Sequence, residues 1–332
     1  MYFLISKIRK ISHSIVFFGI VCFVHGQNLP PIGEDDGYLN LPNQVLTINT
    51  ANGLLSNDSD PDGGLLFINP TPVLAPNSGT VMLNLDGSFD FTPTTGFFDP
   101  ITFQYQVCDD GSTAELVSQL DFSTPMLTNA TVGPNATSIN PNTEQASCGI
   151  RTTTSGGSTG LDIVVPNTAN IFNFTAFEIA FEYRDQEATA DIVSGGNFRI
   201  YHIGANALGV RINVIDSNTG ITTAYTQNLG NFASGSNAYV VSYNEADGSI
   251  TKSVNGATTT YNVAPPFSPL DTSLASAITI GRFMDGAGNA LPSLCGIQVS
   301  DKSSLCHTAL VTINTATRVI TNKQITYRVS RN

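Results

Sequence analysis

The pattern of apolar and polar positions along the chain predicts short β-strands throughout. From Asp36 onward, apolar residues alternate with polar ones in short runs, and turn sequences such as DPDGG and LDGS separate the runs. Alternation with a period of two places successive side chains on opposite faces of a sheet. No long segment has the three- and four-residue spacing of a helix. The pattern therefore predicts an all-β chain, and the spacing of the turns is typical of a β-sandwich.

One predicted strand lacks the partner that should follow it. The stretch TFQYQVCDDGS, residues 102–112, has the pattern of a strand that runs into a turn. The next segment has strand patterns of its own, and a matching partner strand first appears in SSLCHTALVTIN, residues 303–314. We interpret the residues from about Thr113 to Lys302 as a second domain inserted in this last hairpin. Surface loops accept such insertions because loop-closure entropy grows only logarithmically with length.

Four stretches before the insertion indicate the kind of sandwich. They are EDDGY (34–38), GLLSNDSDPDGG (53–64), SGTVMLNLDGSFDFTPTTGF (78–97) and ITFQYQVCDDG (101–111). In this order they resemble the cadherin-like or immunoglobulin-like tandem repeats of bacterial surface proteins. In those repeats the closing strand follows at once. The resemblance therefore implies one discontinuous sandwich built from residues 34–112 and 303–314.

The inserted segment carries a second set of strand patterns. They are FTAFEIAFEYRD (174–185), GGNFRIYHIG (195–204), ALGVRINVID (207–216), AYVVSYNEADGSITKSVNGATTTY (238–261) and SAITIGRFMDGAGN (276–289). We interpret residues 238–261 as two strands around a VNG turn. Together the patterns resemble the laminin G-like, concanavalin A-like jelly rolls. The resemblance implies a carbohydrate or protein ligand and a possible calcium ion at the rim.

The predicted fold is therefore an immunoglobulin-like β-sandwich with a jelly-roll, concanavalin A-like β-sandwich, residues 113–302, inserted in its last hairpin. Residues 315–332 fit neither domain and are interpreted as a tail or linker. The first 26 residues have a basic tip, an apolar stretch from Ile15 to Val24 and a small residue, Gly26. This is the pattern of a secretory signal peptide, and the apolar run is short for a membrane span. We expect a secreted or cell-surface protein.

Charge narrows the choice of partners. The chain has 14 Lys and Arg against 26 Asp and Glu. Removal of the signal peptide takes three basic residues and no acidic ones, which leaves 11 against 26 and a formal charge of −15. Such acidity argues against binding to nucleic acid, whose phosphates would be repelled, and against binding to anionic membranes. It suits a soluble exported protein that binds divalent cations.

Four cysteines remain after signal cleavage, and an even number in an oxidising compartment predicts two disulfides. Their spacing is not that of a zinc site. Cysteine counting alone leaves three pairings open. The nested arrangement implied by the resemblance pairs Cys108 with Cys306 and Cys148 with Cys295.

Acidic residues provide the candidate metal site. Asp58, Asp60 and Asp62 stand at alternate positions before Gly63, as at the start of a calcium loop, but the twelfth position is Asn69 rather than the Glu of an EF-hand. In an immunoglobulin-like sandwich, these residues would lie at one pole together with Asp86 and with the aspartates at positions 35, 36, 109 and 110. We predict structural Ca²⁺ there; the alternative is a set of separate, solvated turns. The predicted metal residues are Asp35, Asp36, Asp58, Asp60, Asp62, Asp109 and Asp110.

Candidate catalytic groups are sparse. Glu178 and Glu182 share one face of a predicted strand, as paired acids do in some jelly-roll glucanases, but Ala180 stands where that motif keeps an Asp. We favour a solvated outer face for this strand. No serine or cysteine nucleophile has a nearby base, and the G-x-S-x-G and H-E-x-x-H motifs are absent. We expect no enzyme activity.

A glycine-rich loop is the candidate ligand rim. In GRFMDGAGN the polar residues Arg282, Asp285 and Asn289 could contact a ligand, although the glycines alone could explain a tight turn. The leading hypothesis is an exported adhesion or binding protein whose laminin G-like domain binds an extracellular glycan or protein, with a calcium-stabilised stalk. A purely structural spacer is the second hypothesis, and a glycoside hydrolase is the third.

Overall fold

The computed structural model covers most of the chain after the predicted signal peptide, which itself lies outside the described residues. Beyond residue 316 only the backbone is described. Within these limits no helix is long and apolar enough to cross a membrane. The described residues are 27–123, 125–146, 149–153, 160–184, 190–204, 206–284, 294–321 and 324–328.

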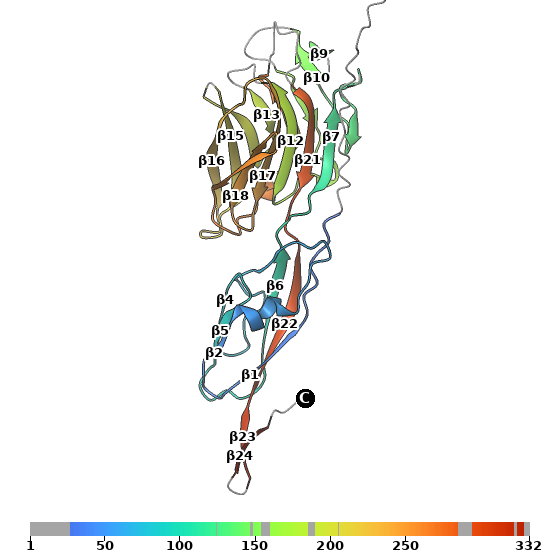
Figure 1. The fold of residues 1–332 in the computed structure, drawn as a ribbon. Coiled ribbons are helices and arrows are strands. Elements are labelled where there is room, and N and C mark those ends of the chain that lie inside the picture. The colour runs from blue at the N-terminus through green and yellow to red at the C-terminus, as the bar shows by residue number, and fades with distance from the viewer. Residues whose placement is uncertain are drawn as a thin grey trace, which may run out of the picture.

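Two β-sandwiches, each with its own core, confirm the predicted fold class (Figure 1). The small sandwich has a four-stranded sheet of order β1-β22-β6-β3 and a three-stranded sheet of order β2-β5-β4. Its core buries alternate residues of β6 and β5, including Phe89, Phe103 and Tyr105. The elements are β1 (Asp36–Asn40), β2 (Leu46–Ile48), η1 (Thr50–Asn52), η2 (Leu54–Ser56), β3 (Leu66–Ile68), β4 (Thr80–Leu83), β5 (Phe89–Thr92), β6 (Ile101–Asp109) and β22 (Cys306–Thr315).

The large sandwich faces a nine-stranded sheet against a six-stranded one. The first has the order β19-β18-β17-β12-β21-β10-β9, with β7 paired to β21 and β8 to β7. The second has the order β11-β20-β13-β14-β15-β16. The elements are β7 (Glu115–Asp121), β8 (Ala130–Val132), β9 (Thr143–Ala146), β10 (Gly149–Thr152), β11 (Ile163–Val165), η3 (Thr168–Asn170), β12 (Phe177–Arg184), β13 (Asp191–Ser194), β14 (Phe198–Ile203), β15 (Ala207–Ile215), β16 (Thr222–Asn231), β17 (Ser236–Asn244), β18 (Ser249–Val254), β19 (Ala257–Asn262), η4 (Thr272–Leu274), β20 (Ile278–Arg282) and β21 (Leu294–Asp301).

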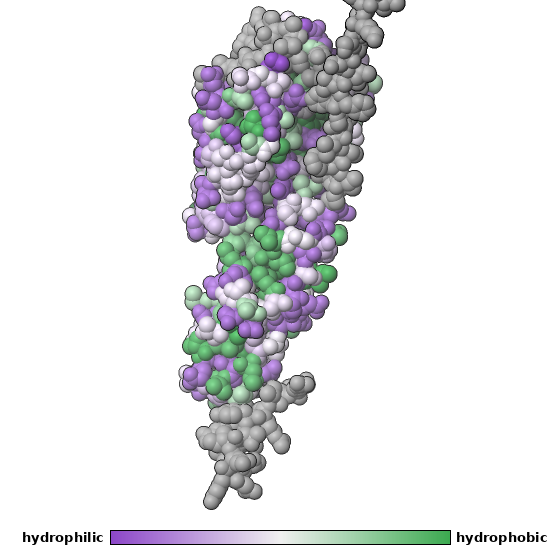
Figure 2. Space-filling view, viewed as in Figure 1, coloured by the Kyte–Doolittle hydropathy of each residue, from purple (hydrophilic) through white to green (hydrophobic). Residues whose placement is uncertain are grey.

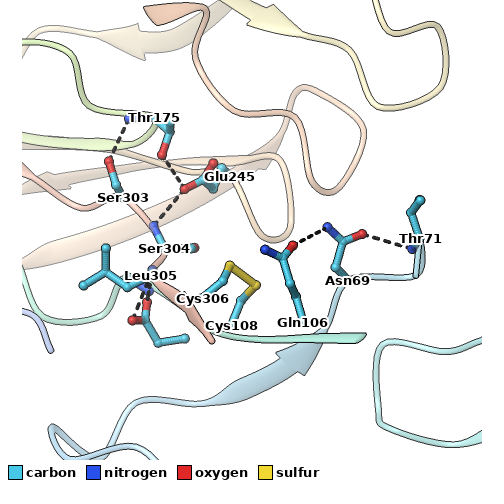
Figure 3. Close-up of a disulfide and its surroundings, with 12 residues drawn as sticks. Asn69, Thr71, Gln106, Cys108, Thr175, Glu245, Ser303, Ser304, Leu305 and Cys306 are labelled. Atoms are coloured by element: carbon cyan, nitrogen blue, oxygen red, sulfur yellow. Dashed lines mark hydrogen bonds between the residues drawn. A yellow bond between two sulfur atoms is a disulfide. The ribbon is translucent and has the colours of Figure 1, made fainter. Parts of the chain in front are cut away.

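The strand pair that the sequence splits is present in the structure. β6 and β22 run antiparallel, with Cys108 opposite Cys306 and Val107 opposite His307. A disulfide joins Cys108 to Cys306 across a sequence separation of 198 residues (Figure 3). Cys295 is also disulfide-bonded, and its predicted partner, Cys148, lies outside the described residues.

The chain enters and leaves the large sandwich on neighbouring strands. β7 follows β6 and pairs antiparallel with β21, which precedes β22, and Glu115 lies opposite Asp301 (Figure 1). Two antiparallel pairs, β6 with β22 and β7 with β21, therefore follow one another across the joint between the sandwiches. The exact limits of the inserted domain, 113 and 302, remain our assignment.

One detail of the predicted insert is wrong. Residues 238–261 form parts of three strands, β17, β18 and β19, rather than two strands around one turn. Asn255 and Gly256, with φ of 49° and 88°, make the expected turn between β18 and β19. An additional turn ends at Gly248, with φ of 70°, and reverses the chain between β17 and β18. The Asp-Gly dipeptide there is itself a hairpin signal that the interpretation overlooked.

The predicted tail contains structure of its own. β23 (Thr317–Thr321) and β24 (Gln324–Arg328) form a separate two-stranded hairpin. Within the described ranges it pairs with no strand of either sandwich, and it extends from the end of β22 (Figure 1).

Replacing both Cys108 and Cys306 by Ala should destabilise the small sandwich by about 3 kcal/mol, because a crosslink over so long a loop restricts the unfolded chain. Native-state hydrogen exchange would show faster exchange of the β6 amides. The β12 amides, in the other core, serve as the internal control and should keep their protection. Unchanged exchange in β6 would contradict a stabilising role for this disulfide.

Candidate functional site

The predicted metal residues lie in two groups on the small sandwich. We call them together the acidic pole. The second group meets the joint at Asp109, whereas in the first group Asp36 lies further along the sheet, opposite Val311 of β22.

In the first group, the buried Tyr105 hydroxyl lies 2.9 Å from Oδ2 of Asp36 and 3.3 Å from Oδ2 of Asp58. One hydroxyl proton can serve only one of these carboxylates at a time. Oδ1 of Asp35 accepts a hydrogen bond from the backbone N–H of Leu310 at 2.9 Å.

The second group of the acidic pole consists of Asp60, Asp62, Asp109 and Asp110. Three of these side chains, Asp60, Asp109 and Asp110, accept the backbone N–H two residues further on, at 2.6, 2.8 and 3.1 Å. This is the Asx turn that short carboxylate side chains favour. Both oxygens of Asp109 also lie 3.2 Å from the N–H of Leu305, so this side chain links the two chain crossings.

Burial disfavours the ionised form of three carboxylates of the acidic pole. Desolvation raises the pKa of Asp36 to about 6, although the hydrogen bond from Tyr105 opposes the shift. Desolvation likewise raises the pKa of Asp58 and of Asp109, where hydrogen bonds from backbone N–H groups oppose it. These three carboxylates thus gain from a proton or from a cation.

The fit to calcium is partial. Oδ2 of Asp60 is buried and has no hydrogen-bond partner among the described residues. This oxygen is therefore free to act as a ligand of a cation. Across the same residues, however, no group of three or more His, Cys, Asp or Glu is arranged to hold a metal ion. Asp86 bonds instead to Thr50 and Ser88. Calcium binding at the pole therefore stays a prediction.

The predicted ligand rim is described only at its beginning. Arg282 ends β20, is exposed, and holds its guanidinium 4.8 Å from the centre of the Phe283 ring. Asp285 and Asn289 lie outside the described residues. A ligand-binding role for these three residues also stays a prediction.

A groove of about 370 Å³ crosses the outer face of the nine-stranded sheet, a feature that the sequence analysis missed. It lies over β7, β21, β12 and β17, which are neighbours in the sheet (Figure 1). Small side chains form its floor, namely Ala180, Ala238, Val240 and Gly296. Polar side chains line it from the same strands, namely Gln119, Asp121, Glu182 and Gln298.

The strand register explains how the groove arises. Ala180 lies between Val240 of β17 and Gln298 of β21, and Glu182 lies between Ala238 and Gly296. The period-two alternation sends intervening residues such as Phe181 and Tyr239 into the core. Small residues in register on adjacent strands leave a trough with polar groups along it. No single strand carries this signal, since only the pairing of distant strands assembles it.

The acids of this face have different surroundings. Glu182 accepts a hydrogen bond from Ser236 Oγ at 2.9 Å, and the register places Asp121 on the other side of Gly296. Glu178 lies outside the groove, with Oε2 3.9 Å from Lys302 Nζ. The carboxylate that accompanies Glu182 in the groove is thus Asp121, which the sequence did not single out, rather than Glu178.

The Asp36→Asn variant should be more stable than the wild type at pH 7.5 and equally stable at pH 4, both measured in chelator. A carboxyl group whose pKa is raised in the folded state stabilises the fold at low pH, and this contribution is lost as the pH rises through about 6. After allowance for solvent screening we expect a difference of about 1 kcal/mol at the higher pH. A stability difference between the variant and the wild type that does not change with pH would contradict the raised pKa of Asp36.

Solved structures similar to this chain are sandwich proteins with low sequence identity. A carbohydrate-binding module (CBM40) of a Ruminococcus gnavus sialidase, bound to α2,3-sialyllactose, is 14% identical, and the match covers 44% of this chain and 91% of that one, with a TM-score of 0.31. An alginate lyase from Alteromonas is 12% identical over 48% and 82% of the two chains, with a TM-score of 0.24. Similarities at this level carry no argument about ligand or activity.

Sequence comparison identifies one part of the chain. No curated protein matches it. Residues 28–121 match the family model of the bacterial Ig domain. The last residues of the match lie in β7, which follows β6 in the sequence but pairs with β21 in the nine-stranded sheet. The strand that pairs with β6 in the small sandwich is instead β22. The chain therefore contains a bacterial Ig-like domain, whose sequence match ends inside the large sandwich.

Proposed function

We propose that this chain is an exported, non-enzymatic binding protein of the cell surface or matrix. In this proposal the large sandwich binds an extracellular glycan in the groove over β12 and β21, and the small sandwich is the stalk that presents it. The observation that carries the proposal is the groove itself, a trough of small side chains bordered by amide and carboxylate groups. Such groups hydrogen-bond to sugar hydroxyls.

The composition of the groove narrows the class of glycan. Asp121 and Glu182 place two carboxylates in it, and the described residues that line it include no Lys or Arg. Uronate or sulfate groups would be repelled there, so the groove favours neutral sugars or amino sugars. Its aromatic lining residues, Phe181 and Tyr239, are buried in the core and cannot stack on a sugar ring. Binding would depend on hydrogen bonds, which favours modest affinity.

A glycan array probed with the full chain, with and without calcium, tests this function. Ala180→Arg fills the floor of the groove and should weaken binding to the retained neutral glycans by about tenfold or more. Thr258→Arg puts the same side chain on exposed β19 and should leave binding unchanged. Absence of binding by the wild type would favour the spacer hypothesis. Polysaccharide hydrolysis abolished by Glu182→Gln would instead identify a glycoside hydrolase.

Calcium stiffening of the stalk is the second part of the proposal. The free Oδ2 of Asp60 and the raised pKa values of Asp58 and Asp109 support it, because a cation would relieve the crowded carboxylates. Such a site would hold the pole in one geometry. It would supply no chemistry beyond neutralising charge.

Millimolar Ca²⁺ added to chelated protein should stabilise the small sandwich by roughly 1 to 3 kcal/mol, as expected for an extracellular site of moderate affinity. Asp60→Asn should remove this effect. Asp86→Asn, which alters a carboxylate bonded elsewhere, should retain it. If the melting temperature of the wild type is the same in calcium and in chelator, the pole is not a calcium site.

A further inference from the structure

A second cavity, of about 360 Å³, lies at the joint between the two sandwiches. We call it the joint pocket. Figure 2 shows that apolar surface gathers where the two sandwiches meet. Residues of both sandwiches and of the segments that connect them line the joint pocket: Phe67, Asn69, Cys108, Thr175, Glu245, Phe267, Pro269, Ser304 and Cys306.

An aromatic pair spans the joint pocket. Phe267 of the large sandwich and Phe67 of the small one have ring centres 5.1 Å apart. Phe267 has a φ of 60°, in the left-handed region that bulky residues avoid. Such a conformation persists only where the surroundings impose it, and it is concentrated at binding and switch sites.

Hydrogen bonds on both sides hold the loop of Phe267 in place. Its own N–H donates to the backbone carbonyl of Glu245 at 2.7 Å. The Ser217 hydroxyl donates to the carbonyl of Pro266 at 2.7 Å, and the Tyr243 hydroxyl donates to the carbonyl of Ser268. The position of the ring over the joint pocket is therefore fixed by the fold.

Glu245 places a buried carboxylate in the same cavity. The residue is 9% exposed, and its Oε1 accepts the Thr175 hydroxyl at 2.6 Å and the N–H of Ser304 at 2.8 Å (Figure 3). Both of these bonds go to Oε1, and within the described part of the chain no Lys or Arg forms an ion pair with the Glu245 side chain. The charge of Asp301, which has the same sign, adds to the unfavourable surroundings of this carboxylate. The nearby Lys302 is directed to Glu178 instead.

A buried carboxylate without a counter-ion is costly. Burial accordingly raises the pKa of Glu245. A cation in the cavity would offset that cost, and aromatic rings attract cations to their faces. The cavity volume lies in the usual range for small-ligand sites, which are often found at domain interfaces.

From these contacts we propose that the joint pocket binds an alkylguanidinium or alkylammonium group against the contacting rings of Phe67 and Phe267, with its charge on the carboxylate of Glu245. This site is separate from the glycan groove and does not depend on it. The group would come either from a basic side chain of a partner protein or from a free amine. Because lining residues come from both sandwiches, an occupant would also fix the angle between them.

Titration calorimetry of the full chain with four compounds and variants tests the proposal. Nα-acetyl-arginine N-methylamide and the corresponding lysine compound represent a protein side chain, and spermidine represents a free amine. Nα-acetyl-citrulline N-methylamide, the neutral analogue of the arginine compound, is the matched ligand control. We expect saturable binding of at least one cation and weaker binding of the citrulline compound by about tenfold or more, since a charged hydrogen bond is lost.

Two variants from opposite sides of the joint make the test specific. Glu245→Gln retains the acceptor for Thr175 and Ser304 but removes the charge, so the fold is kept and cation binding should fall by about tenfold or more. Phe67→Leu, from the small sandwich, should weaken binding about two- to fivefold. Glu178→Gln removes the same charge from a carboxylate that already has a partner and should leave binding unchanged.

Preference for spermidine over the blocked amino acids would identify a free amine as the occupant, and the reverse preference a protein side chain. Equal binding of the citrulline compound, unchanged binding in Glu245→Gln, or no saturation at tens of millimolar would overturn the proposal. Absence of saturation would mean that protonation of Glu245, rather than a bound cation, offsets the cost of burying its carboxylate. None of these outcomes bears on the glycan array, so the two proposals fail independently.

Discussion

The pairing of β6 with β22 is the constraint on which the rest of the structure depends. Without β22 the small sandwich would lose the strand that lies between β6 and β1. In the sequence, β22 follows all the strands of the large sandwich. The disulfide between Cys108 and Cys306 fixes the register at the point where the two segments diverge. The insertion is thus a long loop of the small sandwich, and it also forms a sandwich with a separate hydrophobic core.

Short polar contacts then join the two sandwiches where the chain crosses between them. The Ser303 hydroxyl accepts the N–H of Thr175 at 2.7 Å (Figure 3), and Asp109 accepts the N–H of Leu305, which holds the two chain crossings together on the side of the small sandwich. Glu245 adds the hydrogen bonds from Thr175 and Ser304. Because Thr175 and Glu245 belong to the large sandwich while Ser303 and Ser304 lead into β22, the bonds to these two serines limit rotation of one sandwich about the other. A binding face held at a fixed angle on a stalk suits presentation of a ligand site away from a surface.

The sequence predicted what local alternation and family resemblance can reveal. The strands of the small sandwich follow from local alternation, the late partner of β6 follows from the interrupted hairpin, and the Cys108–Cys306 pair follows from the nested arrangement that the resemblance implies. The groove and the joint pocket were missed because strands far apart in the sequence create them. Ala180 and Gly296 contribute to one groove only because the register places Ala180 opposite Gln298 and Gly296 opposite Glu182 on the adjacent strand. Similarly, nothing near Glu245 in sequence indicates that Phe67 faces the same cavity.

The most direct test of the nested architecture is to remove the insertion. Joining residue 112 to residue 303, in a chain of residues 27–112 and 303–316, keeps every strand of the small sandwich and both cysteines of its disulfide. If the account is correct, this shortened chain unfolds cooperatively and protects its β6 and β22 amides from hydrogen exchange. An unfolded shortened chain, beside a full chain that folds under the same conditions, would contradict it.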